Sequence, residues 1–235
     1  MLNMNPTKSS EPNHALDRLV SLAPFNAQDL SVLARAINNI RTLASRRDLI
    51  VNGSTTSGPM LIVEGWAVRS CILRDGRRQI LNVILPGDVI PRLSSSCVHA
   101  HSITTSTRVR YCYLPDRNQF SDASRLDEAL AISQGLDVDF LYRQITRVGR
   151  LSALERVADW LLEICERLNT AGQCTGNSFA LPLTQEAIAD VLGLTSVHVN
   201  RTLMVLRRNG LIHVEGGRAV ILDYAGCRQL IGSES

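Results

Sequence analysis

The stretch LTQEAIADVLGLTSVHVNRTLMVLRRNG, residues 183–210, decides the fold of the C-terminal part of this chain. Thr184 is a good N-cap for a first helix, because Glu186 follows in the first turn and apolar residues then recur at helical spacing. Gly193 ends that helix, and Thr195 can cap a second helix after a very short connection. Two helices joined so closely form a helix-turn-helix, in which the second helix can enter a DNA major groove.

The second predicted helix has an apolar face and a polar face. Its inward residues are Val199, Leu203 and Leu206, and its outward residues are Ser196, Val197, Asn200, Arg201 and Met204. No acidic residue occurs between positions 195 and 210, whereas three arginines give this segment a charge of +3, which equals the formal net charge of the whole chain. Such a face suits DNA, where Arg201 can bond guanine O6 and N7 and Asn200 can bond an adenine edge.

Residues 211–222 predict a β-hairpin directly after these helices. A Glu-Gly-Gly turn at 215–217 separates two short apolar runs. Such a hairpin is the wing of a winged helix-turn-helix, and its Arg218 can contact a backbone phosphate without reading sequence. An alternative stays open, because helix pairs joined through glycine also occur in ordinary helical bundles, where basic residues at a helix end complement the helix dipole.

The composition of the whole chain is that of a globular protein. It has 235 residues, of which 45% are hydrophobic and 20% charged. No apolar run reaches the length of a membrane span, and the polar start of the chain contains no signal core. We therefore predict a cytoplasmic protein that does not contact membranes, with residues 1–15 as a disordered tail. The six cysteines never occur as Cys-x-x-Cys, which argues against a zinc ribbon or a clustered iron–sulfur site.

The N-terminal part, residues 16–123, predicts two short helices followed by many short strands. The helices are expected at 16–23 and 26–40, with Asn26 as the cap of the second. Strand-like runs are expected at 61–73, 79–85, 89–93 and 104–114, with turns at Asp75-Gly76 and Pro86-Gly87. This pattern favours a barrel or a jelly-roll-like β-roll with an interior that can hold a small ligand.

Residues 124–151 predict one long helix. Its apolar residues follow alternating spacings of three and four, which is a heptad seam, and we expect four of them to form a dimer interface: Val138, Leu141, Ile145 and Val148. The other interpretation is that this stripe packs on its own domain. Gly149 and Ser152 mark the candidate hinge, because Ser152 and Glu155 form a capping box that starts a new helix and a second domain, residues 152–235.

This order of elements resembles the family of the cyclic AMP receptor protein and the fumarate and nitrate reduction regulator, the CRP/FNR family of bacterial regulators. The resemblance covers nearly the whole chain from about residue 16. Its most specific motifs are LTQEAIADVLGLT at 183–195, VNRTL at 199–203, NGLI at 209–212, LIVEGW at 61–66, DGRRQI at 75–80 and LPGD at 85–88. The resemblance implies an α+β fold: an N-terminal β-roll sensor domain, a long dimerisation helix and a C-terminal winged helix-turn-helix.

The resemblance also implies a function. The chain would be a sequence-specific DNA-binding transcription regulator and not an enzyme, acting as a homodimer on a near-palindromic operator, controlled by a signal at the β-roll and in contact with RNA polymerase. Residues at the positions of Ser196, Val197, Asn200 and Arg201 face base edges in the family. Thr184, Thr195, His198 and Arg218 complete the predicted DNA-binding set.

Two departures from the family limit what carries over. Where well-studied members have a glutamate that accepts a bond from cytosine, this chain has Val197 or, one position later, His198. Valine cannot accept such a bond, so the operator should differ there. In the stretches that would cradle a cyclic phosphate, residues 87–92 and 101–103, neither the glutamate nor the arginine is in its expected place, and Arg92 is the one candidate substitute. We therefore expect no cyclic nucleotide and name no cofactor. An effector-independent regulator with a filled roll is one alternative.

The segment Cys97-Val98-His99-Ala100-His101 carries the other alternative. If it is extended, Cys97, His99 and His101 lie on one face and could ligate a metal or haem. The chain would then be a metal-dependent enzyme of the cupin type or a metal or haem sensor. A mobile polar loop is the simpler interpretation of the same residues.

Overall fold

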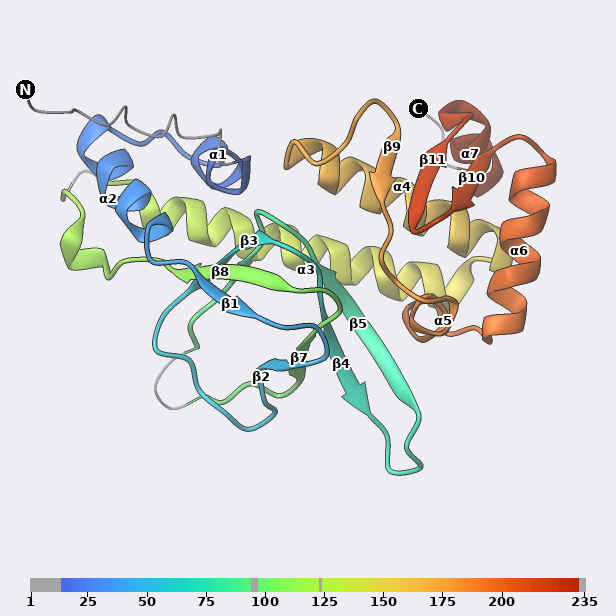
Figure 1. Ribbon diagram of the computed structural model, residues 1–235, viewed down its shortest axis with the longest axis horizontal. Coiled ribbons are helices and arrows are strands. Elements are labelled where there is room, and N and C mark those ends of the chain that lie inside the picture. Colours follow the sequence, from blue (N-terminus) through green and yellow to red (C-terminus); the bar gives the residue numbers. More distant parts are fainter. Residues whose placement is uncertain (1–13, 94–96, 123, 233–235) are drawn as a thin grey trace, which may run out of the picture.

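The computed structural model describes residues 14–93, 97–122 and 124–232, and these have an α+β fold (Figure 1). The chain begins with α1 (His14–Ser21) and α2 (Ala27–Ile37), which lie beside the β-roll. The Asn26 side chain caps α2 by accepting a hydrogen bond from the Asp29 amide at 2.8 Å, as predicted. Residues 1–13 of the predicted tail lie outside the described residues. His14 and Ala15 were assigned to that tail wrongly, because Ala15 is buried in the first turn of α1.

Two four-stranded antiparallel sheets form the roll. One sheet has the order β1 (Arg41–Leu43), β8 (Val109–Tyr113), β3 (Met60–Glu64), β6 (Val89–Ile90). The other has the order β2 (Asp48–Ile50), β7 (Ser102–Thr105), β4 (Ala67–Ile72), β5 (Arg78–Ile84). Their inner side chains fill the space between the sheets with Ile50, Met60, Ile62, Ala67, Ile84, Ile90, Ile103 and Val109. The predicted roll is thus confirmed, and its interior is packed with apolar groups.

The strand boundaries differ from the prediction in two places. The expected runs at 61–73 and 104–114 are each two strands, β3 and β4 and then β7 and β8. Gly65 makes the first turn possible: its φ is +85°, and a Cβ there would lie 2.1 Å from the Arg108 carbonyl oxygen. In addition, β1 and β2 precede the first expected run.

Two helices connect the roll to the C-terminal part. After the 3-10 turn Arg117–Gln119, α3 (Leu126–Arg150) runs along the roll, and α4 (Ala153–Thr170) follows it (Figure 1). Between them only Leu151 and Ser152 leave helical geometry, with ψ angles of 146° and 166°. The predicted capping box is confirmed: the Glu155 amide donates to Ser152 Oγ, and the Ser152 amide donates to the Glu155 carboxylate.

The C-terminal part contains the two helices and two strands expected of the winged fold. It also contains one strand and one helix that were not expected. The expected elements are α5 (Gln185–Leu192), α6 (Ser196–Arg208), β10 (Ile212–Glu215) and β11 (Arg218–Ile221). The additional ones are β9 (Ser178–Ala180), which pairs with β11, and α7 (Tyr224–Ile231), which packs on α4. Their core continues into the roll, because Trp66, Ile80 and Leu85 belong to the same cluster of buried side chains as Trp160 and Leu206.

No helix in the described parts of the chain is both long enough and apolar enough to cross a bilayer.

Candidate nucleic-acid interface

The turn between α5 and α6 is built from local backbone chemistry. Thr184 Oγ1 accepts a hydrogen bond from the Ala187 amide at 3.1 Å, and Thr195 Oγ1 accepts one from the His198 amide at 3.2 Å. Gly193 ends α5 in the left-handed conformation, with φ of +63°. The two threonines therefore cap their helices as predicted, and both remain exposed at the start of the helix they cap.

The two faces of α6 match the sequence analysis. Val199 and Leu206 are fully buried and Leu203 is half-buried, so they hold the helix on the C-terminal core. Thr202 is also buried, which was not predicted. The exposed residues are Ser196, Val197, His198, Asn200, Arg201, Met204, Val205, Arg207 and Arg208. The structure thus brings the expected base-facing residues together on one accessible face of α6. The helix itself lies at the edge of the molecule in Figure 1.

The arginines of α6 are exposed. Within the described residues, no carboxylate lies within 4.0 Å of a guanidinium nitrogen of Arg201, Arg207 or Arg208. By contrast, Arg78, Arg143, Arg147 and Arg167 each contact a carboxylate, as described below. Positive charge without an internal counter-charge attracts anions from solution, and this face is therefore suited to nucleic acid.

The wing stands beside α6. Its strands β10 and β11 are joined by a two-residue turn, Gly216 and Gly217, whose φ angles of +58° and +74° favour glycine. Arg218 begins β11 directly after this turn and is exposed, while its Nη2 donates a hydrogen bond to Ser178 Oγ at 2.9 Å. That bond orients the guanidinium without neutralising it, because a hydroxyl carries no charge.

The C-terminal end of α5 is fixed by side chains from three other elements. Helix ends leave carbonyl groups without partners. Here Gln79 of β5 donates to the carbonyl of Asp190 at 2.7 Å, Gln144 of α3 donates to that of Val191, and Arg156 of α4 donates to that of Leu192 at 3.1 Å. The Asp190 carboxylate also pairs with Arg78 of β5 at 2.7 Å. These contacts set the position of the helix-turn-helix relative to the roll and α3.

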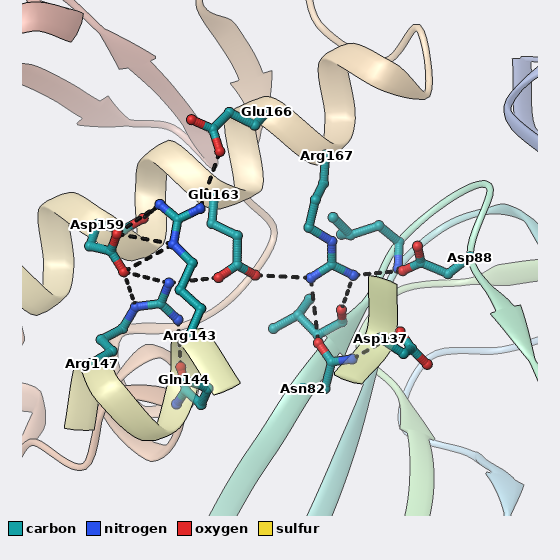
Figure 2. Close-up of polar contacts among 12 residues, drawn as sticks. Asn82, Asp88, Asp137, Arg143, Gln144, Arg147, Asp159, Glu163, Glu166 and Arg167 are labelled. Atoms are coloured by element: carbon teal, nitrogen blue, oxygen red, sulfur yellow. Dashed lines mark hydrogen bonds and ion pairs between the residues drawn. The ribbon is translucent and has the colours of Figure 1, made fainter. Parts of the chain in front are cut away.

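A buried network of charges joins the same three regions (Figure 2). Arg147 of α3 contacts both Asp159 and Glu163 of α4 at 2.6 Å. Arg167 of α4 contacts Glu163 at 3.2 Å and reaches the roll, where it contacts Asp88 at 2.7 Å. The network continues outward through Arg143, which contacts Asp159 at 2.7 Å and Glu166 at 3.2 Å, and through Arg18 of α1, which also contacts Asp88.

Asp88 stays charged although it is buried, with 6% of its surface exposed. Burial by itself would raise the pKa of its carboxyl, but the positive charges of Arg167 and Arg18 outweigh burial and hold this pKa below its ordinary value. Asp137 of α3, which lies on the same side of the roll, shows the opposite balance: burial, and then the negative charge of Asp88, raise its pKa.

Sequence reasoning missed this network and the anchoring of α5. A partial signal was present, because Arg143 and Arg147 are four residues apart on one helix while Asp159 and Glu163 are four residues apart on the next. Two such stripes of opposite charge on consecutive helices indicate pairing once the helices are known to pack together. Nothing in the local sequence identifies Asp88 as a partner of Arg167, or Gln79 and Gln144 as partners of the α5 carbonyl groups.

The predicted dimer seam lies on the face of α3 away from the network. Its Val138 and Ile145 are 42% and 64% exposed, and Leu141 and Val148 are half-buried. Tyr142, which was not predicted, is also 64% exposed beside them. Of the two candidate hinge residues, Ser152 lies at the interruption between α3 and α4, whereas Gly149 lies within the last turn of α3.

The residues that would hold a cyclic nucleotide do not fit that ligand. Asp88 uses its carboxylate on Arg18, Arg167 and the Leu85 amide. No arginine occurs at 101–103 to pair with the phosphate of such a ligand.

The proposed ligand group of Cys97, His99 and His101 is not formed. No group of three or more such side chains in the described ranges is arranged to hold a metal. The physical reason is that residues 97–101 are irregular rather than extended, since β7 begins only at Ser102, so the side chains do not alternate. Cys97 is exposed, whereas His99 is buried, and burial and then the nearby charge of Arg69 lower its pKa.

Comparison with known proteins agrees with this architecture. A Crp-like helix-turn-helix domain matches residues 155–230. The chain is 35% identical over 176 residues, 70% of each sequence, to the nitrogen fixation regulation protein FixK of Bradyrhizobium diazoefficiens. It is 29% identical over 221 residues, 91% of this chain and 88% of the relative, to the transcriptional activator protein FnrL of Cereibacter sphaeroides.

A solved structure supports the same fold over most of the chain. FixK2 from Bradyrhizobium japonicum superimposes with a TM-score of 0.72 at 24% identity, covering 84% of this chain and 98% of that one. Together with the sequence relatives, this result does not favour the metal-dependent enzyme. The chain belongs to the CRP/FNR family of DNA-binding transcription regulators, which are not enzymes.

Proposed function

We propose that the protein acts in the cytoplasm as a homodimer that binds a near-palindromic operator, with the two α6 helices in neighbouring major grooves about one duplex turn apart. The observation that carries this proposal is the exposed face of α6, where Asn200 and Arg201 are adjacent and no carboxylate within the described residues pairs with Arg201. Two-fold symmetric regulators place their half-sites about one helical turn apart.

We assign different roles to the residues of this face. Arg201 reads guanine through O6 and N7, and Asn200 and Ser196 bond neighbouring base edges. Contacts to phosphates come from the helix starts and the wing: Thr184, Thr195, His198 and Arg218. Such contacts position the protein on the duplex but carry no sequence information.

The dimer forms along α3 in this proposal. Val138 and Ile145 leave apolar surface in water, and a second copy of the same helix, related by a two-fold axis, would cover it with its own seam. Leu141 and Val148 would complete the contact. RNA polymerase would meet a separate surface, for which the exposed Ile72 and Leu73 of the hairpin between β4 and β5 are available.

Control by a signal would act at the junction of α3 and α4. The pivot would be the extended pair Leu151 and Ser152, with Gly149 allowing the end of α3 to deform. A rotation of the winged domain must then break the contacts of Asp190 with Arg78 and of Arg167 with Asp88. The fraction of molecules competent to bind DNA would depend on the free-energy difference between the arrangements with and without these contacts.

Sedimentation equilibrium combined with DNA binding tests the dimer. Ile145→Asp should give a monomer that no longer binds the palindromic duplex with high affinity. The substitution places one carboxylate from each copy in the apolar dimer interface, and the two negative charges repel. Ile72→Asp is the matched control, since Ile72 is also exposed, at 71%, and lies outside the seam. A wild-type monomer, or an Ile145→Asp protein that stays dimeric, would contradict the proposal.

A further inference from the structure

The first turn of α6 presents an apolar side chain that the fold does not use. Val197 is 58% exposed, although Val199, two residues later, is fully buried in the core. Its neighbours in sequence, Ser196 and His198, are exposed and polar. An apolar group in water gains nothing from solvent, whereas covering it is favourable, so this valine is available to a partner.

Val197 lies on the same stripe of the helix as the predicted base-reading residues. Residues three and four positions apart on a helix are neighbours, so Val197 lies next to both Asn200 and Arg201. The first turn of a recognition helix is the part that meets base edges. Any groove that accepts the Arg201 guanidinium therefore also brings the Val197 methyl groups against a neighbouring base pair.

Only one base offers an apolar group in the major groove. Thymine carries a C5 methyl there, whereas cytosine, guanine and adenine present hydrogen-bonding groups. Valine neither donates nor accepts a hydrogen bond, so placing it over the cytosine amino group would leave that donor without a partner and without water.

We infer that Val197 is a specificity-determining residue that selects thymine over cytosine by packing against the C5 methyl group. The neighbouring Cβ atoms are about 5–6 Å apart on a helix, and base pairs stack about 3.4 Å apart, so this thymine lies one or two base pairs from the guanine bound by Arg201. The inference rests on the proposed function, because it requires α6 to lie in the major groove.

Deoxyuridine provides the direct test, because it differs from thymine only by the missing methyl. Each thymine within two base pairs of the Arg201 guanine is replaced in turn in the bound operator, and affinity is measured by fluorescence anisotropy. At one position the wild type should bind roughly three- to fivefold more weakly, which is the effect of one buried methyl-sized group. Replacing that base pair by one with 5-methylcytosine should be tolerated better than replacing it by one with cytosine.

Variants show whether Val197 causes the effect. Val197→Ala should bind thymine and deoxyuridine operators equally, whereas Met204→Ala, which shortens another exposed apolar residue of the same helix, should keep the difference. Both sites are on the surface, so unchanged thermal unfolding confirms folded protein. Equal wild-type binding to all thymine and deoxyuridine operators would overturn the inference while leaving the proposed function intact. Absence of any specific operator would overturn both.

Discussion

Arginine serves two different purposes in two regions of this molecule. At the junction of the roll, α3 and α4, each of four arginines contacts at least one carboxylate: Arg18, Arg143, Arg147 and Arg167. On α6, the arginines Arg201, Arg207 and Arg208 are exposed. Their guanidinium groups have no carboxylate partner in the described part of the chain. The same side chain fixes the position of domains in one region and is left for an external anion in the other.

Burial explains this difference. A charge removed from water is tolerated only when it is paired and hydrogen-bonded, so the junction needs as many carboxylates as it has guanidinium groups to satisfy. On an exposed helix the cost of an unpaired charge is small, and a carboxylate beside it would weaken attraction to phosphate. The junction should therefore govern stability, and α6 should govern binding.

Arg167→Met should have the largest effect on the stability of the junction. It removes contacts to Asp88, Glu163 and the Val83 carbonyl inside the protein. Loss of one partner from a buried ion pair costs about 3–5 kcal/mol, and we expect the free energy of unfolding in urea to fall by about the lower of these values, because both acids keep one arginine. Arg208→Met, the exposed counterpart, should leave it unchanged. Equal stability of the two variants would contradict the distinction.

The junction should also make stability depend on pH on the acid side. Because the folded protein holds the pKa of Asp88 below its ordinary value of 3.8, its contribution is complete above that value and is lost as pH falls through the folded pKa. Unfolding followed by circular dichroism from pH 5 downward measures this loss. Asp88→Asn should show a shallower decline than the wild type, and parallel curves would argue that other carboxyls dominate.

Arg201→Ala should affect DNA binding by α6 and leave stability unchanged. We expect a loss of about 1–3 kcal/mol of discrimination at one guanine, corresponding to roughly five- to 150-fold in relative affinity, with unchanged unfolding. The measurement compares binding of the operator with binding of the same duplex lacking that guanine. A variant that still prefers the original operator to the same degree would place base reading elsewhere.

Arg218→Ala should have the smallest effect. Its guanidinium stands at the wing turn and is shared with Ser178, so we expect a phosphate contact that weakens all duplexes about equally and lowers the salt dependence of binding by about one ion. Affinities over a series of salt concentrations test this. A change confined to one DNA sequence would instead assign Arg218 to base reading.

The elements that sequence predicted well are those whose signals are local. Thr184, Gly193 and Thr195 each act on the backbone within a few residues, so the helix-turn-helix and the exposed face of α6 could be predicted from the order of residues alone. The capping box at Ser152 followed the same logic. Such signals need no knowledge of what packs against the helix.

Elements that depend on distant partners could not be predicted. Asp88 is 79 positions from Arg167, and Gln144 is 47 from Val191, so their contacts exist only once the fold has formed. The helix α7 had a usable local signal in the Asp223 cap and the terminal Gly232, but Gly226 within it favours a turn and obscured the helix. Gly65 was a usable signal for the turn between β3 and β4, but a single glycine inside an apolar run also fits a bulge within one strand.

Selection of bound sequences from a pool of random duplexes tests the central claim most directly, namely that two α6 helices read DNA as a symmetric pair. The account predicts enrichment of two inverted copies of a short half-site that contains a guanine, with centres about 10 base pairs apart. Enrichment of a single half-site, or of no sequence at physiological salt, would contradict it.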